Sequence, residues 1–184
     1  DAEQLLDTST ITQNFMYHLY NYPVYEKTSD KSKYIEFMMI GFGKHSQKFL
    51  DIVLQIVQMP GKRLNVTVIS DSAEDKEIYL SQRPELSDFF NVDGSLADEN
   101  ESYGNINFVV HSFSKTGEKR NMEFISEYKA DYIFVSVGSD DFNLSLAKTL
   151  NVACYVCVPL ERNKVRRGIP ENIIPIYITK NISN

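Results

Sequence analysis

Residues 34–46 have the sequence YIEFMMIGFGKHS and carry the most informative pattern of the chain. The run IEFMMI has no charge after Glu36 and ends at Gly41-Phe42-Gly43, and the apolar residues of the next stretch, 44–58, recur at helical spacing. The pattern predicts a buried strand, a tight turn and a helix in succession. In nucleotide-binding α/β folds, the first turn of this kind is the phosphate loop.

Each position of this turn suits a bound phosphate. Gly41 permits the tight turn, Gly43 lets the backbone approach a pyrophosphate, and the third position, Ser46, is small enough for the helix to pack on the strand. The helix N-terminus offers free N–H groups and partial positive charge to an anion. Lys44 and His45 either add charge and hydrogen bonds there or face solvent as ordinary first-turn residues. The predicted phosphate-binding residues are Gly41, Phe42, Gly43, Lys44, His45 and Ser46.

Strand and helix patterns alternate along the rest of the chain. The strand runs are continuously apolar, as in a parallel sheet covered on both faces. We therefore predict an α/β fold, a three-layer Rossmann-like doubly wound arrangement with a mostly parallel sheet of about six strands and an N-terminal helical extension. Residues 91–105, acidic and rich in turn formers, are interpreted as an irregular excursion. The further predicted strands are 65–70, 105–113, 131–138, 153–160 and 173–180, and the further predicted helices are 71–82, 117–130 and 139–151.

The N-terminal part of the chain differs from the rest in its composition. Residues 1–33 are predicted to form a helix and a connector, and residues 34–184 the Rossmann-like nucleotide-binding domain. Tyrosines crowd the end of this helix and the connector. The interpretation is that they pack the helix onto the main body, and the alternative is an exposed partner surface, since aromatic residues are enriched at interfaces. These tyrosines are Tyr17, Tyr20, Tyr22 and Tyr25.

The composition limits the partners and the location of the protein. The chain has 184 residues and a formal net charge of −6, and this acidity argues against holding nucleic acid by phosphate neutralisation. No apolar run approaches the ~20 residues of a membrane span, so membrane insertion is not expected. Cys154 and Cys157 fall in a predicted buried strand and point to opposite faces. They are interpreted as core thiols of a cytoplasmic protein.

The ends of later strands supply further candidate ligand contacts. Ser70 or Asp71 closes the second predicted strand, where an acidic residue accepts a hydrogen bond from a ribose hydroxyl in such folds. The acidic residues that follow would repel a 2′-phosphate, which favours NAD or another adenine nucleotide as the cofactor. After the fourth strand, Gly138, Ser139 and Asp140 lie at the edge where ligands bind, and the alternative is that an aspartate here caps the next helix.

Two other features carry alternatives. His111, at the end of the third strand, is a candidate ligand contact and the best candidate proton donor, although strand-end histidines commonly have structural or solvent roles. The basic residues after the fifth strand are interpreted as a solvated loop, and the alternative is a contact for phosphates or for an acidic partner. These basic residues are Arg162, Lys164, Arg166 and Arg167.

The glycine turn, the acidic end of the second strand and especially residues 132–150, YIFVSVGSDDFNLSLAKTL, resemble the TrkA-N domain. This domain is the Rossmann nucleotide-binding half of regulator-of-potassium-conductance (RCK) proteins, and the resemblance covers about residues 34–160. It implies that the glycine turn holds phosphate and that Ser70 or Asp71 meets the ribose. It also implies that residues 138–140 border the crevice, with Asn143 in the following helix.

The chain departs from the family pattern in several places. Ser46 replaces the third glycine, and His111-Ser112 stands where the family usually has Gly-Asp. The stretch 80–105 is longer than the usual second crossover. Because the family pairs through helices of this domain, a homodimer is one expected form.

Several functions are compatible with these residues. The first is a non-catalytic regulatory module that binds NAD or an adenine nucleotide and acts on other domains of the same longer chain; Asp1 in place of Met is interpreted as the mark of such a piece. The second is a small NAD(P)-dependent oxidoreductase, although no Tyr-x-x-x-Lys pair follows the fourth strand. A methyltransferase would normally have an acidic residue at Ile40. The last is a Rossmann scaffold that has lost its ligand and serves protein–protein interaction.

Overall fold

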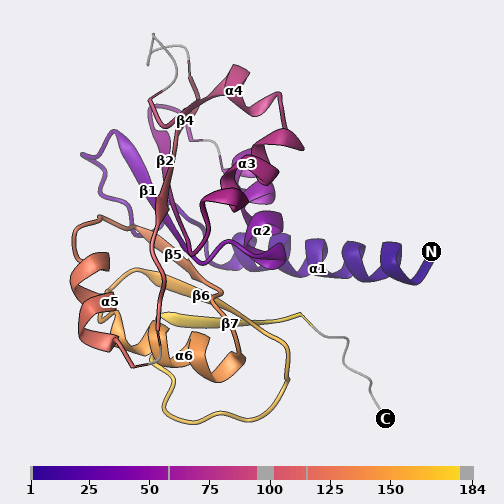
Figure 1. Cartoon of the computed structure of the whole chain (residues 1–184), viewed down its shortest axis with the longest axis vertical. Coiled ribbons are helices and arrows are strands. Elements are labelled where there is room, and N and C mark those ends of the chain that lie inside the picture. The colour runs from indigo at the N-terminus through magenta and orange to yellow at the C-terminus, as the bar shows by residue number, and fades with distance from the viewer. Residues whose placement is uncertain (1, 58, 95–101, 115, 179–184) are drawn as a thin grey trace.

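One parallel sheet with helices on both faces forms the frame of the computed structural model (Figure 1). The structure describes residues 2–57, 59–94, 102–114 and 116–178, with side chains from Thr10 onward. The elements are α1 (Ala2–Asn21), β1 (Tyr34–Ile40), α2 (Lys44–Ile56), β2 (Arg63–Ser70), α3 (Ala73–Ser81), α4 (Leu86–Phe89), β3 (Phe90–Val92), β4 (Gly104–Val110), α5 (Glu118–Ile125), β5 (Tyr132–Val135), α6 (Asp140–Thr149), β6 (Tyr155–Leu160) and β7 (Ile173–Tyr177).

The order of the strands in the sheet indicates the edge at which a ligand would bind, without reference to any side chain. The sheet has seven strands in the order β3-β4-β2-β1-β5-β6-β7, and every pair is parallel. The chain builds outward from β1 on one side and then returns to β5 on the other, so the order reverses between β1 and β5. This confirms the predicted doubly wound fold, with one strand more than expected. In such sheets, ligands bind outside the carboxyl ends of the strands at this reversal.

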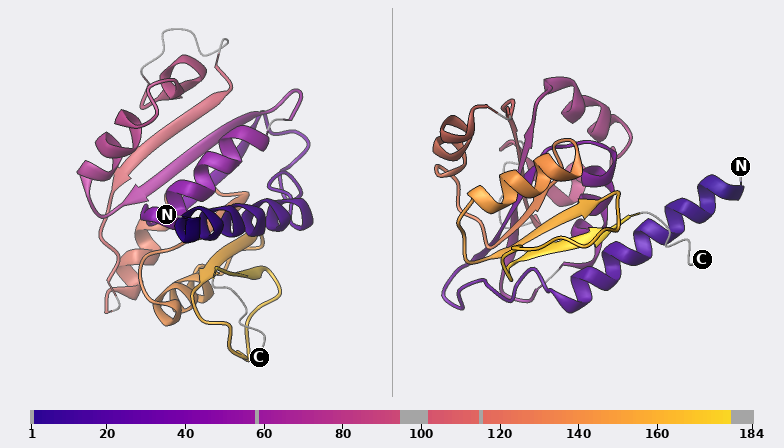
Figure 2. Two further views of the ribbon diagram at one scale, coloured as in Figure 1. Left: turned by 90° about the vertical axis from the view of Figure 1, so that its right-hand side faces the viewer. Right: turned by 90° about the horizontal axis from the view of Figure 1, so that it is seen from below.

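Alternate residues of the central strands enter two separate cores. Phe37 and Met39 of β1 pack with α1, α2 and α3, whereas Met38 and Ile40 pack with α5 and α6. The side chains of a strand alternate between the two faces of its sheet, so an uninterrupted apolar run is what a strand covered on both faces requires. Figures 1 and 2 show α2 and α3 on the opposite side of the sheet from α5 and α6.

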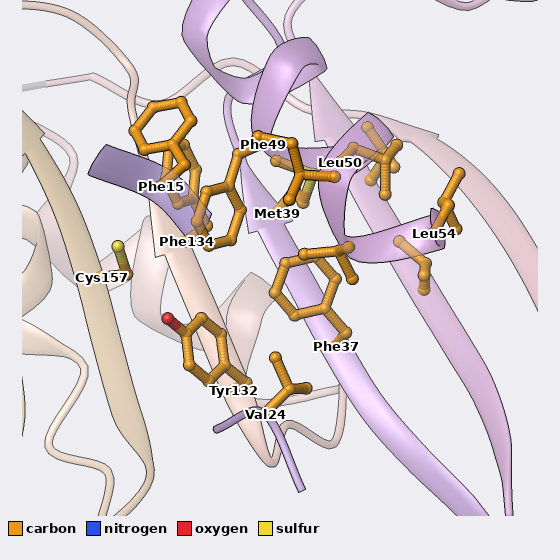
Figure 3. Close-up of a cluster of buried hydrophobic side chains, with 14 of the residues drawn as sticks. Phe15, Val24, Phe37, Met39, Phe49, Leu50, Leu54, Tyr132, Phe134 and Cys157 are labelled. Atoms are coloured by element: carbon orange, nitrogen blue, oxygen red, sulfur yellow. The ribbon is translucent and has the colours of Figure 1, made fainter. Parts of the chain in front are cut away.

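The second half of α1 belongs to the main core. The Phe15 ring is fully buried and meets the ring of Phe49 edge-on, with centroids 5.1 Å apart. Figure 3 shows Phe15 beside Phe49 and Phe134, side chains of three different elements. The N-terminal end of the helix projects away from the body (Figure 2). The hydrophobic core therefore crosses the expected boundary at residue 33.

The tyrosines of this region do not all pack the helix onto the body. Tyr17 and Tyr20 are 72% and 83% exposed, and Tyr25 is half exposed. Only Tyr22 packs inward, against His18 and Tyr155. The interpretation as packing residues is thus wrong for three of the four, because their positions lie on the helix face opposite Phe15 and on the connector surface.

Residues 91–105 were expected to be irregular, but β3 extends into the start of this stretch and β4 begins before its end, at Gly104. The short strand β3 pairs in parallel with β4, with Phe90 opposite Gly104. A strand of three residues is too short for its pattern to be recognised. The expected irregular stretch begins only at Asp93, and its residues 95–101 lie outside the described part of the chain.

Cys154 and Cys157 are buried free thiols, as predicted. Within the described residues, no group of histidine, cysteine and acidic side chains is arranged to hold a metal ion. None of the described helices has the length and apolar character needed to cross a membrane.

Candidate functional site

The turn after β1 is held against the turn after β5. Gly41 has a φ of +90°, and a Cβ at this position would lie 2.0 Å from the backbone oxygen of Ser136. The Gly41 amide donates to the carbonyl of Ile69, and the Ser136 amide donates to the carbonyl of Ile40. Glycine is therefore required at position 41 both by the backbone conformation and by the close approach of the two loops.

The start of α2 offers unoccupied hydrogen-bond donors. Gly43 is the N-cap residue, no side chain caps the helix, and its first turn contains no acidic residue. The first N–H groups of such a helix have no partner within the helix and carry partial positive charge. A Cβ on Gly43 would have nothing within 4 Å. The backbone there is thus open to close approach by an anion.

A pocket of about 330 Å³ lies at this reversal point of the strand order. Its volume is at the lower end of the ~300–1,000 Å³ that small-molecule sites occupy. The loops that follow β1, β2, β4 and β5 provide the walls. The predicted residues that line it are Gly41, Phe42, Gly43, Lys44, His45, Asp71, His111 and Gly138.

The end of β2 separates the roles of the two candidate ribose contacts. Ser70 is buried, and its hydroxyl donates to the Asp75 carboxylate and accepts from the amide of Ser72. Asp71 lines the pocket, is exposed, and has no hydrogen-bond or ion-pair partner among the described residues. Asp71, and not Ser70, is the group available to a ribose. Asp75 also lines the pocket, and it was not among the residues predicted from the sequence. Its position four residues after Asp71 was the signal that could have placed it near Asp71.

His111 lies just after β4, beside the end of β2, within a small aromatic cluster. Its ring stacks on Phe124, with centroids 3.9 Å apart, and meets Phe113 edge-on at 4.7 Å. The Nε2 atom is buried and has no hydrogen-bond partner among the described residues. Phe113, which also lines the pocket, was not among the predicted residues. This wall combines an aromatic surface with an unused polar atom.

The remaining predicted residues support the loops and do not line the pocket. Ser46 is fully buried beneath the turn, and its hydroxyl has no hydrogen-bond partner in the described part of the chain. Ser139 caps α6 by accepting a hydrogen bond from the Phe142 amide. Asp140 accepts hydrogen bonds from the amides of Glu161 and Arg162. The predicted alternative, a helix cap by an aspartate, is therefore wrong: Ser139 is the cap, and Asp140 instead holds the loop that follows β6.

Asn143 holds the wall that follows β5. Its side-chain oxygen accepts hydrogen bonds from the amides of Val137 and Gly138 at 2.7 and 3.1 Å, and its amide group donates to the carbonyl of Gly138. The residue is buried in α6. The resemblance placed Asn143 in this helix, but its role in shaping the loop required the folded geometry.

Basic side chains gather beside the start of α2. Burial lowers the pKa of His45, and the neighbouring Lys44 lowers it further, whereas Glu161 raises it. Burial and Lys44 likewise lower the pKa of Lys48. An anion bound at this helix start would relieve the repulsion among these groups and favour their charged forms.

A larger groove of about 1280 Å³ lies between α1 and β7. It lacks the features that converge on the smaller pocket, namely a glycine turn, a helix start and the ends of central strands. Size alone does not identify a ligand site, and we therefore take the smaller pocket as the candidate.

No model of a known protein family matches the chain, and no curated protein matches it. The class of the protein follows from its architecture: it is an α/β protein with a Rossmann-like, doubly wound parallel sheet.

Proposed function

We propose that this chain is a non-catalytic nucleotide-binding module, which takes NAD or an adenine nucleotide and acts on other domains according to its occupancy. The pocket at the reversal of the strand order carries the proposal. There the uncapped start of α2 and the unpaired carboxylate of Asp71 border the same space. The first suits phosphates and the second suits ribose hydroxyls. This combination is also the one implied by the resemblance to the TrkA-N domain.

The oxidoreductase alternative has less support. His111, the best candidate proton donor in the sequence, lines the pocket, and its ring is stacked on Phe124. A catalytic histidine is normally oriented by a hydrogen bond to a further group. None of the described residues makes such a bond to Nε2 of His111.

The packing of α1 supports a regulatory role. Phe15 contacts Phe49 of α2 and Phe134 of β5, with ring centroids 5.1 and 6.0 Å apart. The helix α2 begins at the phosphate turn, and β5 leads into the loop that contacts Gly41. Because close-packed cores transmit small shifts, a displacement of either element on binding would be felt by α1. We propose α1 as the element that reports occupancy.

Isothermal titration calorimetry with ATP, ADP, NAD⁺ and NADH tests the proposal. We expect heat of binding from at least one of these ligands and none with the Gly43→Val variant, because the valine side chain fills the space that phosphate needs. Asp71→Asn should weaken binding about tenfold by removing a charged acceptor. Asp88→Asn is the matched control. Asp88 is exposed on α4, so this substitution removes the same charge at a position away from the pocket.

The outcomes separate the candidate functions. Binding that persists unchanged in Gly43→Val would place the site elsewhere. A complete lack of response to these nucleotides would contradict the proposal and leave the scaffold function. Turnover of NAD(P)H with a panel of carbonyl compounds would instead support the oxidoreductase.

A further inference from the structure

We propose that the pocket selects a nucleoside 5′-phosphate such as ADP over a dinucleotide such as NAD, an inference that rests on the proposed nucleotide-binding function. The extent of the pocket is the first observation. Its walls come from the ends of β1, β2, β4 and β5, and no residue of the described loop between β6 and β7 lines it. The space therefore ends at β5.

The residues that line the pocket divide into a side for phosphate and a side for the nucleoside. Lys44 and His45 border the phosphate side at the start of α2, and Asp71 and His111 border the side formed by β2 and β4. A phosphate at the first position leaves the ribose hydroxyls to Asp71 and the base to the aromatic wall around His111. The second nucleoside of a dinucleotide would have to continue beyond the phosphates, past the end of β5 toward β6.

A network of charged side chains blocks the path from the end of β5 toward β6. Asp140, the first residue of α6, accepts hydrogen bonds from the amides of Glu161 and Arg162, both at 2.9 Å. It also pairs with the Arg166 guanidinium at 3.1 Å, and the two side chains are only 13% and 9% exposed. Arg166 in turn donates to the carbonyl of Arg162. The loop between β6 and β7, gold in Figure 1, is thereby tied to the start of α6.

Breaking this network to admit a second nucleoside is costly. Removing one partner of a largely buried ion pair leaves the other charge without compensation. One of the basic residues after β6, Arg166, thus has a structural role. The interpretation of these residues as a solvated loop did not include that role. We call Asp140, Arg166 and the backbone of residues 161–162 the β6 latch.

The charge at the phosphate side favours the same ligand class. Lys44, His45 and Lys48 crowd the start of α2, and burial and mutual repulsion lower the pKa of His45 and Lys48. The diphosphate of ADP carries about one more negative charge than the pyrophosphate of NAD, because ADP ends in a phosphate with two ionisable oxygens whereas each phosphate of NAD has only one. A more highly charged ligand gains more from the ammonium groups of Lys44 and Lys48, and it favours the charged form of His45.

Calorimetric titration of the whole chain with AMP, ADP, ATP and NAD⁺ tests the selectivity. We expect at least one mononucleotide to bind about tenfold or more tightly than NAD⁺. NAD⁺ binding as tight as the best mononucleotide would overturn the inference while leaving the proposed function intact. If none of the four ligands gives heat of binding, the proposed nucleotide-binding function itself is contradicted. Failure of the selectivity and failure of the proposed function are therefore distinguishable.

Two neighbouring carboxylates test the latch. Asp140→Ala should strengthen NAD⁺ binding several-fold and leave mononucleotide binding unchanged, which narrows the ratio of the two affinities. Asp141→Ala is the matched control, because Asp141 occupies the next position of the same helix but is 85% exposed and makes only a distant pair with Lys164. An unchanged ratio in Asp140→Ala would overturn the latch as the cause of selectivity. If that variant does not fold, Arg166→Gln tests the same prediction with Asp140 in place.

Discussion

Gly41 and Gly43 lie two residues apart in one turn and have different requirements. The positive φ of Gly41 and the nearby Ser136 carbonyl leave no room for a side chain. Gly43 has a φ of −77° and a ψ of −170°, an extended conformation that any residue can adopt, and open space lies beside it. The first glycine is needed by the fold, whereas the second is needed only if something binds there.

Stability measurements should separate these two glycines. Gly41→Ala is expected to lower the free energy of unfolding by about 3 kcal/mol, through backbone strain and the clash with Ser136. Gly43→Ala should cost less than about 1 kcal/mol, since it changes only a weak N-cap preference. Urea denaturation of the two variants beside the unaltered protein is the measurement. Equal losses would contradict the assignment of separate roles.

His18 gives the protein a titratable group inside the core. Its Nε2 lies 2.7 Å from the hydroxyl of Tyr132, and burial lowers its pKa from 6.5 to about 4. The unfolded chain therefore takes up a proton at a higher pH than the folded protein does. The folded state should lose about 3 kcal/mol of stability from this group as the pH falls from 6.5 to 4.

Unfolding experiments at pH 7 and pH 4 test this dependence. Acidic groups and His45 also titrate over this range, so the comparison is made with His18→Gln, which keeps a polar partner for Tyr132 but cannot be protonated. The loss of stability on acidification should be smaller in the variant by about 3 kcal/mol. Parallel losses in both proteins would show that His18 is accessible to protons in the folded state.

At the scale of elements, α1 combines a buried face with an exposed one. Phe15 is fully buried against α2 and β5, whereas Tyr20, on the same helix, is 83% exposed. Phe15→Ala should lower the free energy of unfolding by about 3–5 kcal/mol, and Tyr20→Ala by less than about 0.5 kcal/mol. Chemical denaturation measures both. Similar small losses would mean that α1 is an appendage and not part of the core.

Elements with long apolar runs were predictable, and short ones were not. The strands β1, β2 and β4 to β7 correspond to predicted strands because each contains a run of consecutive apolar residues. The short β3 and α4 were missed because four or fewer residues show no period. Their formation depends on pairing with β4, which follows in the sequence.

The candidate site was predictable to a similar degree. The glycine turn, Asp71 and His111 stand at strand ends, and the carboxyl ends of parallel strands meet at one edge. The participation of Phe113 depends on the path of a loop, which has no periodic signal. The use of Asp140 inside the β6 latch depends on Arg166, 26 residues later in the chain.

At the scale of the whole molecule, the pocket and α1 are connected through the same core. If nucleotide binding is reported through α1, a saturating ligand should slow amide hydrogen exchange in residues 10–21. At a hundred times its Kd, the ligand should add about 2.7 kcal/mol to stability and raise Tm by about 5–10 °C. Exchange mass spectrometry with and without the best-binding nucleotide measures the effect.

The Gly43→Val variant is the control for this coupling. It should show neither the Tm rise nor the slower exchange, because its pocket is filled. Binding to the unaltered chain with no change in α1 would contradict the reporting role while leaving the binding site in place.

The sequence by itself determined the class of fold, the order of the main elements and the position of the glycine turn. These follow from local patterns: apolar runs, helical periodicity and glycines at a strand end. Only the tertiary structure decided that Asp71 and not Ser70 borders the pocket, that α1 shares the main core, and that Asp140 ties down the loop after β6. The reason is physical, because each of these depends on contacts between residues far apart in the chain, which exist only once the sheet has brought its strand ends and helices together.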